Sequence, residues 1–157
     1  GQKNGKGFYN YVEGSRAPHP APENEAIYEK VSEENGFERR EISDQEIIDR
    51  CILALVNEGA KILEEGVAQR SGDMDIVYIN GYGFPIWRGG PMFYANHLGL
   101  EEVIKKMEVF SESDSDFWKP APLLLKLAGE SGSFGEAPPL DERAKLLSFK
   151  QANMGGV

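Results

Sequence analysis

Residues 43–66 read SDQEIIDRCILALVNEGAKILEEG and form the longest regular pattern in the chain. Ser43 is followed three residues later by Glu46, which is the capping-box pattern of a helix N-terminus. Apolar residues then recur every three or four positions, which predicts one helix over about 44–65 with a single apolar face. That face comprises Ile48, Cys51, Ile52, Leu55, Gly59, Ile62 and Leu63. Gly59 predicts close approach of another helix, and Gly66 predicts the helix end.

Shorter helical patterns lie on both sides of this segment. Upstream, residues 23–36 predict a short polar helix that ends at Gly36. Downstream, we expect helices over 71–80, 91–98, 100–110, 120–128 and 141–150. Ser71 or Asp73 would cap the first of these, and Pro91 suits a first helical turn, where its missing N–H costs nothing. Five or six helices without an alternating strand pattern predict an all-α fold.

Composition narrows the function classes. The chain has 157 residues and a formal net charge of -9, so it has no positive field to attract nucleic acid or an anionic membrane. No apolar run approaches the roughly 20 residues of a membrane span. Cys51 is the one cysteine, which excludes an internal disulfide and favours a reducing compartment. Its place in the apolar pattern predicts a core position.

Residues 80–96, NGYGFPIWRGGPMFYAN, combine glycines with aromatics and could be a cofactor loop or a packed corner. A dinucleotide-binding turn needs G-x-G-x-x-G between a strand and a helix. Here the third glycine is missing and a helix precedes the motif. We therefore predict a structural corner between two helices, in which glycines permit tight turns and aromatics supply apolar area. Its residues are Gly81, Gly83, Phe84, Pro85, Trp87, Gly89, Gly90, Pro91, Phe93 and Tyr94.

The other candidate patterns for a phosphate-binding, metal-binding or catalytic site are also incomplete. Residues 1–7, GQKNGKG, are one residue too short for a phosphate-binding loop and lack its Ser or Thr. His19 and His97 are too few for a metal cluster and assemble no nucleophile–base pair. Asp73 and Asp75 are interpreted as caps of the 71–80 helix. Glu58, Glu64 and Glu65 are interpreted as a solvated face, with a buried pair of Glu58 and Asn57 as the alternative. We predict no catalytic, cofactor-binding or metal-binding residue in this chain.

At this point the sequence resembles a known family. The segments GKGFYNY, NEGAKILEEGVA, NGYGFPIWRGGPMFYANHLGL and KPAPLLLKLA occur in the order found at the C-terminal end of bifunctional enoyl-CoA hydratase/L-3-hydroxyacyl-CoA dehydrogenases of the peroxisomal type. The resemblance covers about residues 1–130. It implies a dehydrogenase C-terminal-domain fold in which residues 1–12 end a preceding helical repeat. Residues 13–40 would be a linker, and residues 41–157 would be a second helical repeat.

The resemblance also implies a role. In the family, the catalytic residues and the NAD-binding glycines lie upstream, so NAD belongs to the full-length enzyme and none is bound by this chain. The expected partners are the preceding helical repeat and the hydratase and Rossmann domains of the same polypeptide. Trp87, Phe93 and Tyr94 are expected to line apolar surface, through which the chain alone forms a weak homodimer. In the family, the single-domain dehydrogenases and the first repeats usually have Asp where Asn96 stands. Asn cannot supply that charge, which weakens any substrate role for the loop in this repeat.

The leading hypothesis is therefore a non-catalytic structural domain of an NAD-dependent 3-hydroxyacyl-CoA dehydrogenase, inactive by itself. An independent helical interaction module and an enzyme with a site of its own remain the alternatives. The chain starts at Gly1 in mid-pattern, so we expect a piece of a longer protein. It ends in Met-Gly-Gly-Val rather than Ser-Lys-Leu, so we expect no peroxisomal signal and a cytoplasmic, bacterial-type protein.

Overall fold

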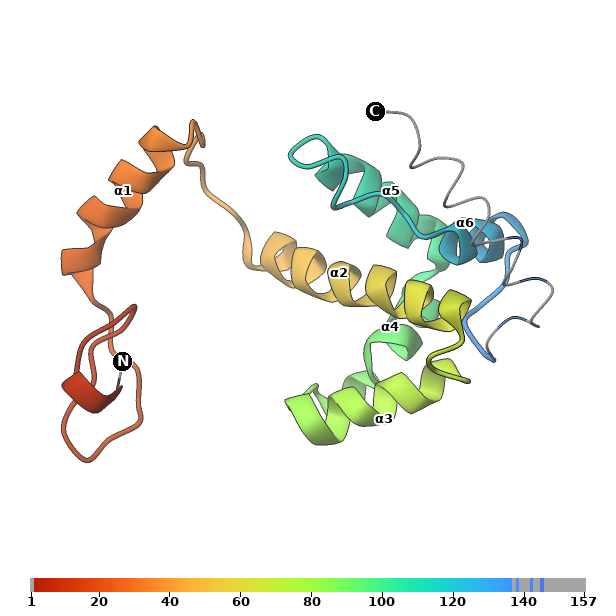
Figure 1. The fold of residues 1–157 in the computed structure, drawn as a ribbon, viewed down its shortest axis with the longest axis horizontal. Helices are drawn as coiled ribbons and strands as arrows, with labels where there is room; N and C mark the ends of the chain where they lie inside the picture. Colours follow the sequence, from red (N-terminus) through yellow and green to blue (C-terminus); the bar gives the residue numbers. More distant parts are fainter. Residues whose placement is uncertain (1, 137, 139–141, 143–144, 146–157) are drawn as a thin grey trace. The chain divides into compact units, whose positions relative to one another are not determined.

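The computed structural model describes residues 2–136, 138, 142 and 145. The chain divides into two compact units, Gly1–Ile42 and Ser43–Val157. Within the described residues every regular element is a helix, and the only pairings of strand type are two isolated antiparallel bridges, Asn10–His19 and Arg70–Glu136. The all-α prediction is confirmed (Figure 1).

The first unit is small and has no buried core. It contains two 3₁₀ turns, η1 (Gln2–Asn4) and η2 (Pro22–Asn24), and one helix, α1 (Glu25–Glu34). The backbone of Asn10 exchanges two 2.9 Å hydrogen bonds with that of His19. Asn24 Nδ2 donates to the carbonyl of Gly7 at 2.7 Å. None of the residues from 3 to 42 is buried, so hydrogen bonds rather than apolar burial hold this unit together.

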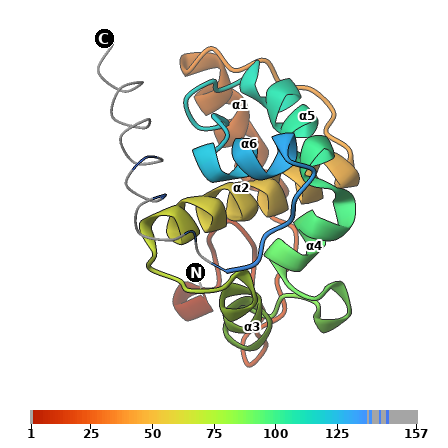
Figure 2. The ribbon, with the colours of Figure 1, turned by 90° about the vertical axis from the view of Figure 1, so that its right-hand side faces the viewer.

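The second unit holds the other helices, arranged around α2 (Asp44–Glu65). They are α3 (Ser71–Tyr82), the 3₁₀ turn η3 (Ile86–Arg88), α4 (Pro91–Leu98), α5 (Leu100–Ser111) and α6 (Pro122–Gly129). α2 contacts α3, α4, α5 and α6, and in both views it lies between α6 and α3 (Figures 1 and 2). The helix expected over 141–150 lies almost entirely outside the described residues; Glu142 and Lys145 are helical.

The ends of α2 follow the local sequence signals. Ser43 Oγ accepts a hydrogen bond from the backbone N–H of Glu46 at 3.2 Å, as a capping residue should. The Glu46 carboxylate pairs with Arg50 one turn later, at 2.9 Å. At the other end Gly66 adopts the left-handed conformation, with φ 69°, and its N–H bonds back to the last turn.

The face of α2 that enters the core is not the one predicted from the sequence. Leu53, Val56, Ala60 and Leu63 are 0–1% exposed and form the centre of the core. Of the predicted stripe only Gly59 and Leu63 are buried. Ile48 is 45% exposed, and Cys51 is exposed rather than in the core. The prediction was wrong because α2 is apolar on two sides, and periodicity alone cannot say which side the other helices cover.

Two further predictions about α2 have opposite outcomes. Gly59 does permit a close approach, because a Cβ there would lie 2.5 Å from the sulfur of Met92 in α4. Glu64, in contrast, is fully buried and not part of a solvated face. Glu58 is exposed and pairs with Lys61 at 3.1 Å, so the alternative of a buried pair with Asn57 is wrong.

Candidate functional site

The glycine-rich corner joins α3 to α4 through two left-handed turns. α3 ends at Tyr82, and Gly83 caps it with φ 72°, so that the N–H of Phe84 bonds back to the carbonyl of Tyr78 at 3.0 Å. Pro85 then precedes η3, and Gly89 adopts φ 74°. Gly81 does not turn the chain, because it lies inside α3. Gly83 and Gly89, but not Gly81, therefore turn the chain between the two helices.

The buried Asp75 side chain stabilises the corner, whereas the sequence predicted that it caps the 71–80 helix. Asp75 is 7% exposed and does not cap α3; its two carboxylate oxygens accept from the N–H groups of Met92 (2.8 Å) and Phe93 (3.1 Å) at the start of α4. Gly90 has φ 95°, and a Cβ there would lie 2.4 Å from the Asp75 side chain. Burial raises the pKa of Asp75, and the two backbone hydrogen bonds oppose that rise.

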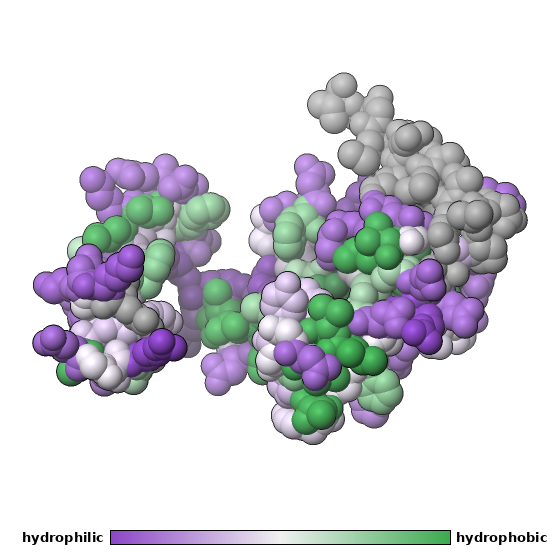
Figure 3. Space-filling model, turned by 60° about the horizontal axis from the view of Figure 1, so that its bottom comes forward, coloured by the Kyte–Doolittle hydropathy of each residue, from purple (hydrophilic) through white to green (hydrophobic). Residues whose placement is uncertain are grey.

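The aromatic side chains of the corner are exposed or only half-buried. Trp87 is 75% exposed and Phe93 57% exposed, whereas Phe84 and Tyr94 are half-buried. The guanidinium of Arg88 lies 4.5 Å from the ring centre of Trp87 and 5.4 Å from that of Tyr94. Hydrophobic residues gather on the α3 side of this unit in Figure 3. The corner therefore presents apolar surface rather than a pocket of converging polar groups.

A second buried carboxylate supports α6 in the same way. Glu64 Oε1 accepts a 2.5 Å hydrogen bond from the N–H of Leu123, in the first turn of α6. Beside it, the buried Asn57 accepts from the N–H of Ala121 (2.8 Å) and donates to the carbonyl of Lys119 (2.9 Å). α4 and α6 both begin with proline after a residue that has no hydrogen-bonding side chain, Gly90 or Ala121. Their caps come from α2 and α3, and carboxylates are favoured there by the helix dipole.

Asn96 and Asp49 make further polar contacts that are partly or fully buried. Asn96 Nδ2 donates to the carbonyl of Phe134 (3.0 Å), and its Oδ1 accepts from the N–H of the same residue (2.7 Å). An Asp could make only the second of these bonds. Asp49, 4% exposed, pairs with Lys106 of α5 at 2.8 Å, which raises the pKa of Lys106. Both contacts hold segments distant in sequence together.

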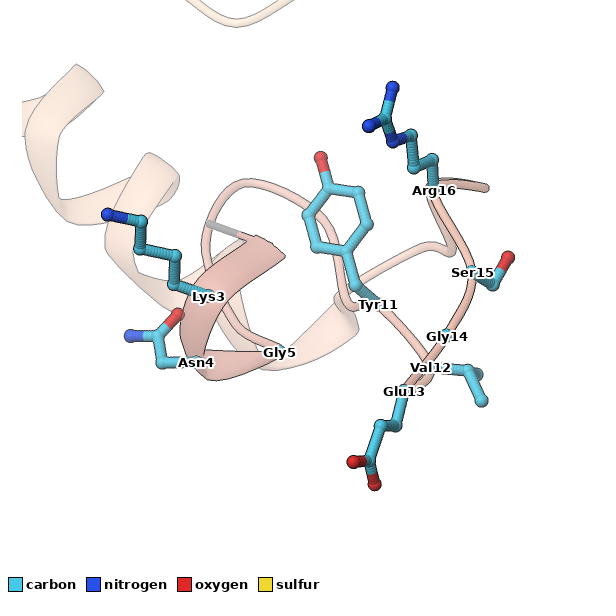
Figure 4. A pocket seen from close by; sticks show the side chains of 9 residues that line it. All are labelled: Lys3, Asn4, Gly5, Tyr11, Val12, Glu13, Gly14, Ser15 and Arg16. Carbon is cyan, nitrogen blue, oxygen red and sulfur yellow. The ribbon is translucent and has the colours of Figure 1, made fainter.

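A hollow in the first unit shows no constellation for chemistry. It measures about 650 Å³ and is lined by Lys3, Asn4, Gly5, Tyr11, Val12, Glu13, Gly14, Ser15 and Arg16. Figure 4 shows that these side chains point in different directions, with Lys3 and Asn4 on one side and Glu13 on another. His19 and His97 are both exposed. Within the described part of the chain, no three His, Cys, Asp or Glu side chains are grouped as metal ligands would be. The same residues include no helix with the length and hydrophobicity to cross a bilayer.

Comparison with known proteins gives long, clear matches. The chain is 41% identical over 145 residues to the peroxisomal bifunctional enzyme of Danio rerio, a match that spans 90% of this chain and 20% of that protein. It is 38% identical over 157 residues to the peroxisomal bifunctional enzyme of Homo sapiens, a match that spans 98% of this chain and 21% of that protein. The fatty acid oxidation complex subunit alpha of the bacterium Shewanella sp. is 34% identical over 135 residues, a match that spans 85% of this chain and 19% of that protein. No protein-family model matches the chain.

The chain is homologous to one segment of these multifunctional fatty acid oxidation enzymes. It spans about a fifth of their length. The resemblance stated from the sequence is thereby confirmed. Sequence reasoning missed the roles of Asn57, Glu64 and Asp75. One signal was present: two helices start with proline, and the residue before each proline has no capping side chain. Such helix ends need a cap from another part of the chain.

Proposed function

We propose that this chain is a non-catalytic, structural helical domain of an NAD-dependent L-3-hydroxyacyl-CoA dehydrogenase of fatty acid β-oxidation. The observation that carries the proposal is the use of the buried polar side chains. Asn57, Glu64 and Asp75 each bind backbone N–H groups at the start of another helix. Groups engaged in this way hold the fold together and are not oriented toward a substrate.

The partner in this proposal is the preceding helical repeat of the same polypeptide, together with its hydratase and NAD-binding domains. Two features support it. The relatives are about five times longer than the matched segment. In addition, none of residues 3–42 is buried, as expected if residues 1–12 complete a repeat that lies outside this chain. An independent interaction module is less favoured, because the homology continues over nearly the whole chain.

The proposal is tested in two ways. Calorimetric titration of the isolated chain with millimolar NAD should give no saturable heat; micromolar binding would overturn it. In the complete enzyme, Asp75→Ala should lower the thermal midpoint while leaving the KM values for NAD and 3-hydroxyacyl-CoA unchanged. Asp73→Ala, a change on the exposed side of the same helix, is the control. A raised KM at unchanged stability would mean that Asp75 contacts substrate.

The names of the relatives agree only in part with the cytoplasmic location predicted for this chain. A cytoplasmic, bacterial-type location agrees with the bacterial alpha subunits, whereas other relatives are named peroxisomal or glyoxysomal. The location stays a prediction, which fractionation of the source cells with an antibody to residues 100–112 tests.

A further inference from the structure

Three asparagines of the chain are followed directly by glycine: Asn4, Asn35 and Asn80. In such a pair the backbone nitrogen of the glycine can attack the side-chain amide carbon of the asparagine, because glycine has no side chain to block the approach. All three asparagines are exposed, so access to water does not distinguish them. The direction in which each side chain is held does distinguish them.

The side chain of Asn4 is folded forward along the chain. Its Oδ1 accepts a hydrogen bond from the backbone N–H of Lys6 at 3.3 Å. The ring that this bond closes contains the peptide nitrogen of Gly5, so the amide carbon and the nitrogen that attacks it are held within one turn. The same bond draws electron density toward Oδ1, which makes the amide carbon more electrophilic. Gly5 itself has φ 72°, in the left-handed region that favours glycine.

The other two asparagines are folded backward. Asn35 Nδ2 donates to the carbonyl of Val31 at 2.8 Å, and Asn80 Nδ2 donates to the carbonyl of Ile76 at 2.9 Å. Each bond directs the amide toward the preceding turn of the helix, away from the nitrogen of the following glycine. Both side chains must therefore be released before they can react.

The two backward-folded asparagines differ in the free energy that this release requires. Asn35 is the C-cap of α1, a helix of ten residues with none buried, and so short a helix without packing is marginal in water. Asn80 and Gly81 both lie inside α3, which is packed into the core through Met74 and Asp75. Opening α3 therefore costs more free energy than fraying the end of α1.

We infer that Asn4 is a site of spontaneous deamidation, which reacts faster than Asn35 and far faster than Asn80. The nitrogen of Gly5 bonds to the amide carbon of Asn4, the amide nitrogen leaves as ammonia with the proton of that N–H, and a cyclic imide remains. Water then opens the imide at either carbonyl to give an aspartyl or an isoaspartyl residue. Neither step needs a cofactor or an oxidant. The inference does not depend on the role proposed for the chain in a complete enzyme.

The modification lies in the part of the chain that has no buried core. The carbonyl of Gly5 accepts a hydrogen bond from the N–H of Tyr11 at 2.8 Å. An isoaspartyl residue adds a methylene group to the main chain beside this bond, and either product adds a negative charge to the net charge of -9. Because none of residues 3–42 is buried, no apolar packing resists the change.

Peptide mapping of the folded 157-residue chain tests the order of reaction. The chain is incubated at mildly alkaline pH, where the attacking nitrogen loses its proton more readily. Digestion after aromatic residues then places the three pairs in separate peptides. Mass spectrometry measures the replacement of NH₂ by OH, and an isoaspartyl methyltransferase with a labelled methyl donor detects isoaspartate.

We expect Asn4 to convert about five times faster than Asn35, which must first break a side-chain hydrogen bond. Asn80 should convert at least about ten times more slowly than Asn35. The chain unfolded in urea is the control, because without turns and helices the three pairs should convert at nearly equal rates. Equal rates in the folded chain, or a slower conversion at Asn4 than at either other asparagine, would overturn the inference.

Two substitutions test whether the N–H of Lys6 positions Asn4. Lys6→Pro removes this donor and should slow conversion at Asn4 about fivefold, whereas Lys6→Ala keeps the N–H and should leave the rate unchanged. Asn4→Gln is the control for the product, since it should remove the first acidic form that appears on isoelectric focusing. An unchanged rate in Lys6→Pro, or an equal fall in Lys6→Ala, would overturn the role of the hydrogen bond.

Discussion

Asp75→Ala tests the idea that a buried carboxylate of α3 holds the start of α4. The substitution removes the acceptor of two hydrogen bonds, to the N–H of Met92 at 2.8 Å and to that of Phe93 at 3.1 Å. Both donors belong to a helix end whose own N-cap, Gly90, has no side chain, so they lose their acceptor. A buried donor left unsatisfied costs about 1–3 kcal/mol.

The loss is smaller than the sum of the two hydrogen bonds. Burial raises the pKa of Asp75, which shows that the ionised side chain is partly desolvated, and alanine relieves that cost. We therefore expect a net loss of about 2–3 kcal/mol in the free energy of unfolding, or a fall of roughly 10–20 °C in the thermal midpoint. Asp75→Asn keeps one acceptor and should cost about half as much.

Urea unfolding of the helical unit, followed by circular dichroism, measures these losses. Asp73→Ala is the control on the same helix: Asp73 pairs with Arg70 at 2.8 Å and its side chain is 40% exposed, so the loss should stay below about 1 kcal/mol. An Asp75→Ala variant no less stable than Asp73→Ala would refute the capping role.

The same residue gives a pH dependence with a definite sign. Because the pKa of Asp75 is higher in the folded chain than in the unfolded one, the folded state binds its proton more tightly. The stability of the wild type relative to Asp75→Asn should therefore be greatest below pH of about 4 and fall as the pH rises through the raised folded-state pKa. A difference that grows toward neutral pH would contradict the raised pKa.

Three further predictions concern the other caps and contacts. Ser43→Ala removes the N-cap of α2 and should cost on the order of 1 kcal/mol in urea unfolding. Asn96→Asp removes an amide donor and should cost about 1–2 kcal/mol, whereas Asn80→Asp, at an exposed position, should cost under about 0.5 kcal/mol. Lys106 has a pKa raised by its hydrogen bond to Asp49, so its contribution to stability should persist below pH of about 10 and disappear at higher pH; a Lys106→Ala variant should lack this alkaline loss.

The helix boundaries and the fold class could be predicted because their signals are local. Ser43 and Gly66 mark the ends of α2, Pro91 marks the start of α4, and Gly36 follows the end of α1. Each of these residues acts on backbone groups within about one turn of itself, so its effect is the same in any tertiary setting. Composition and the glycine pattern likewise led to the prediction of a structural corner.

The side of α2 that faces the core, and the targets of the buried polar side chains, could not be predicted in this way. Leu53 and Leu55 are equally apolar, but only Leu53 is fully buried, because the positions of α4, α5 and α6 determine which side of α2 is covered. Glu64 looks like any surface glutamate until α6 begins beside it, 59 residues later. Local sequence therefore determined where each helix begins and ends. Tertiary structure decided which faces are buried and which carboxylate caps which helix, because those choices depend on residues that only folding brings together.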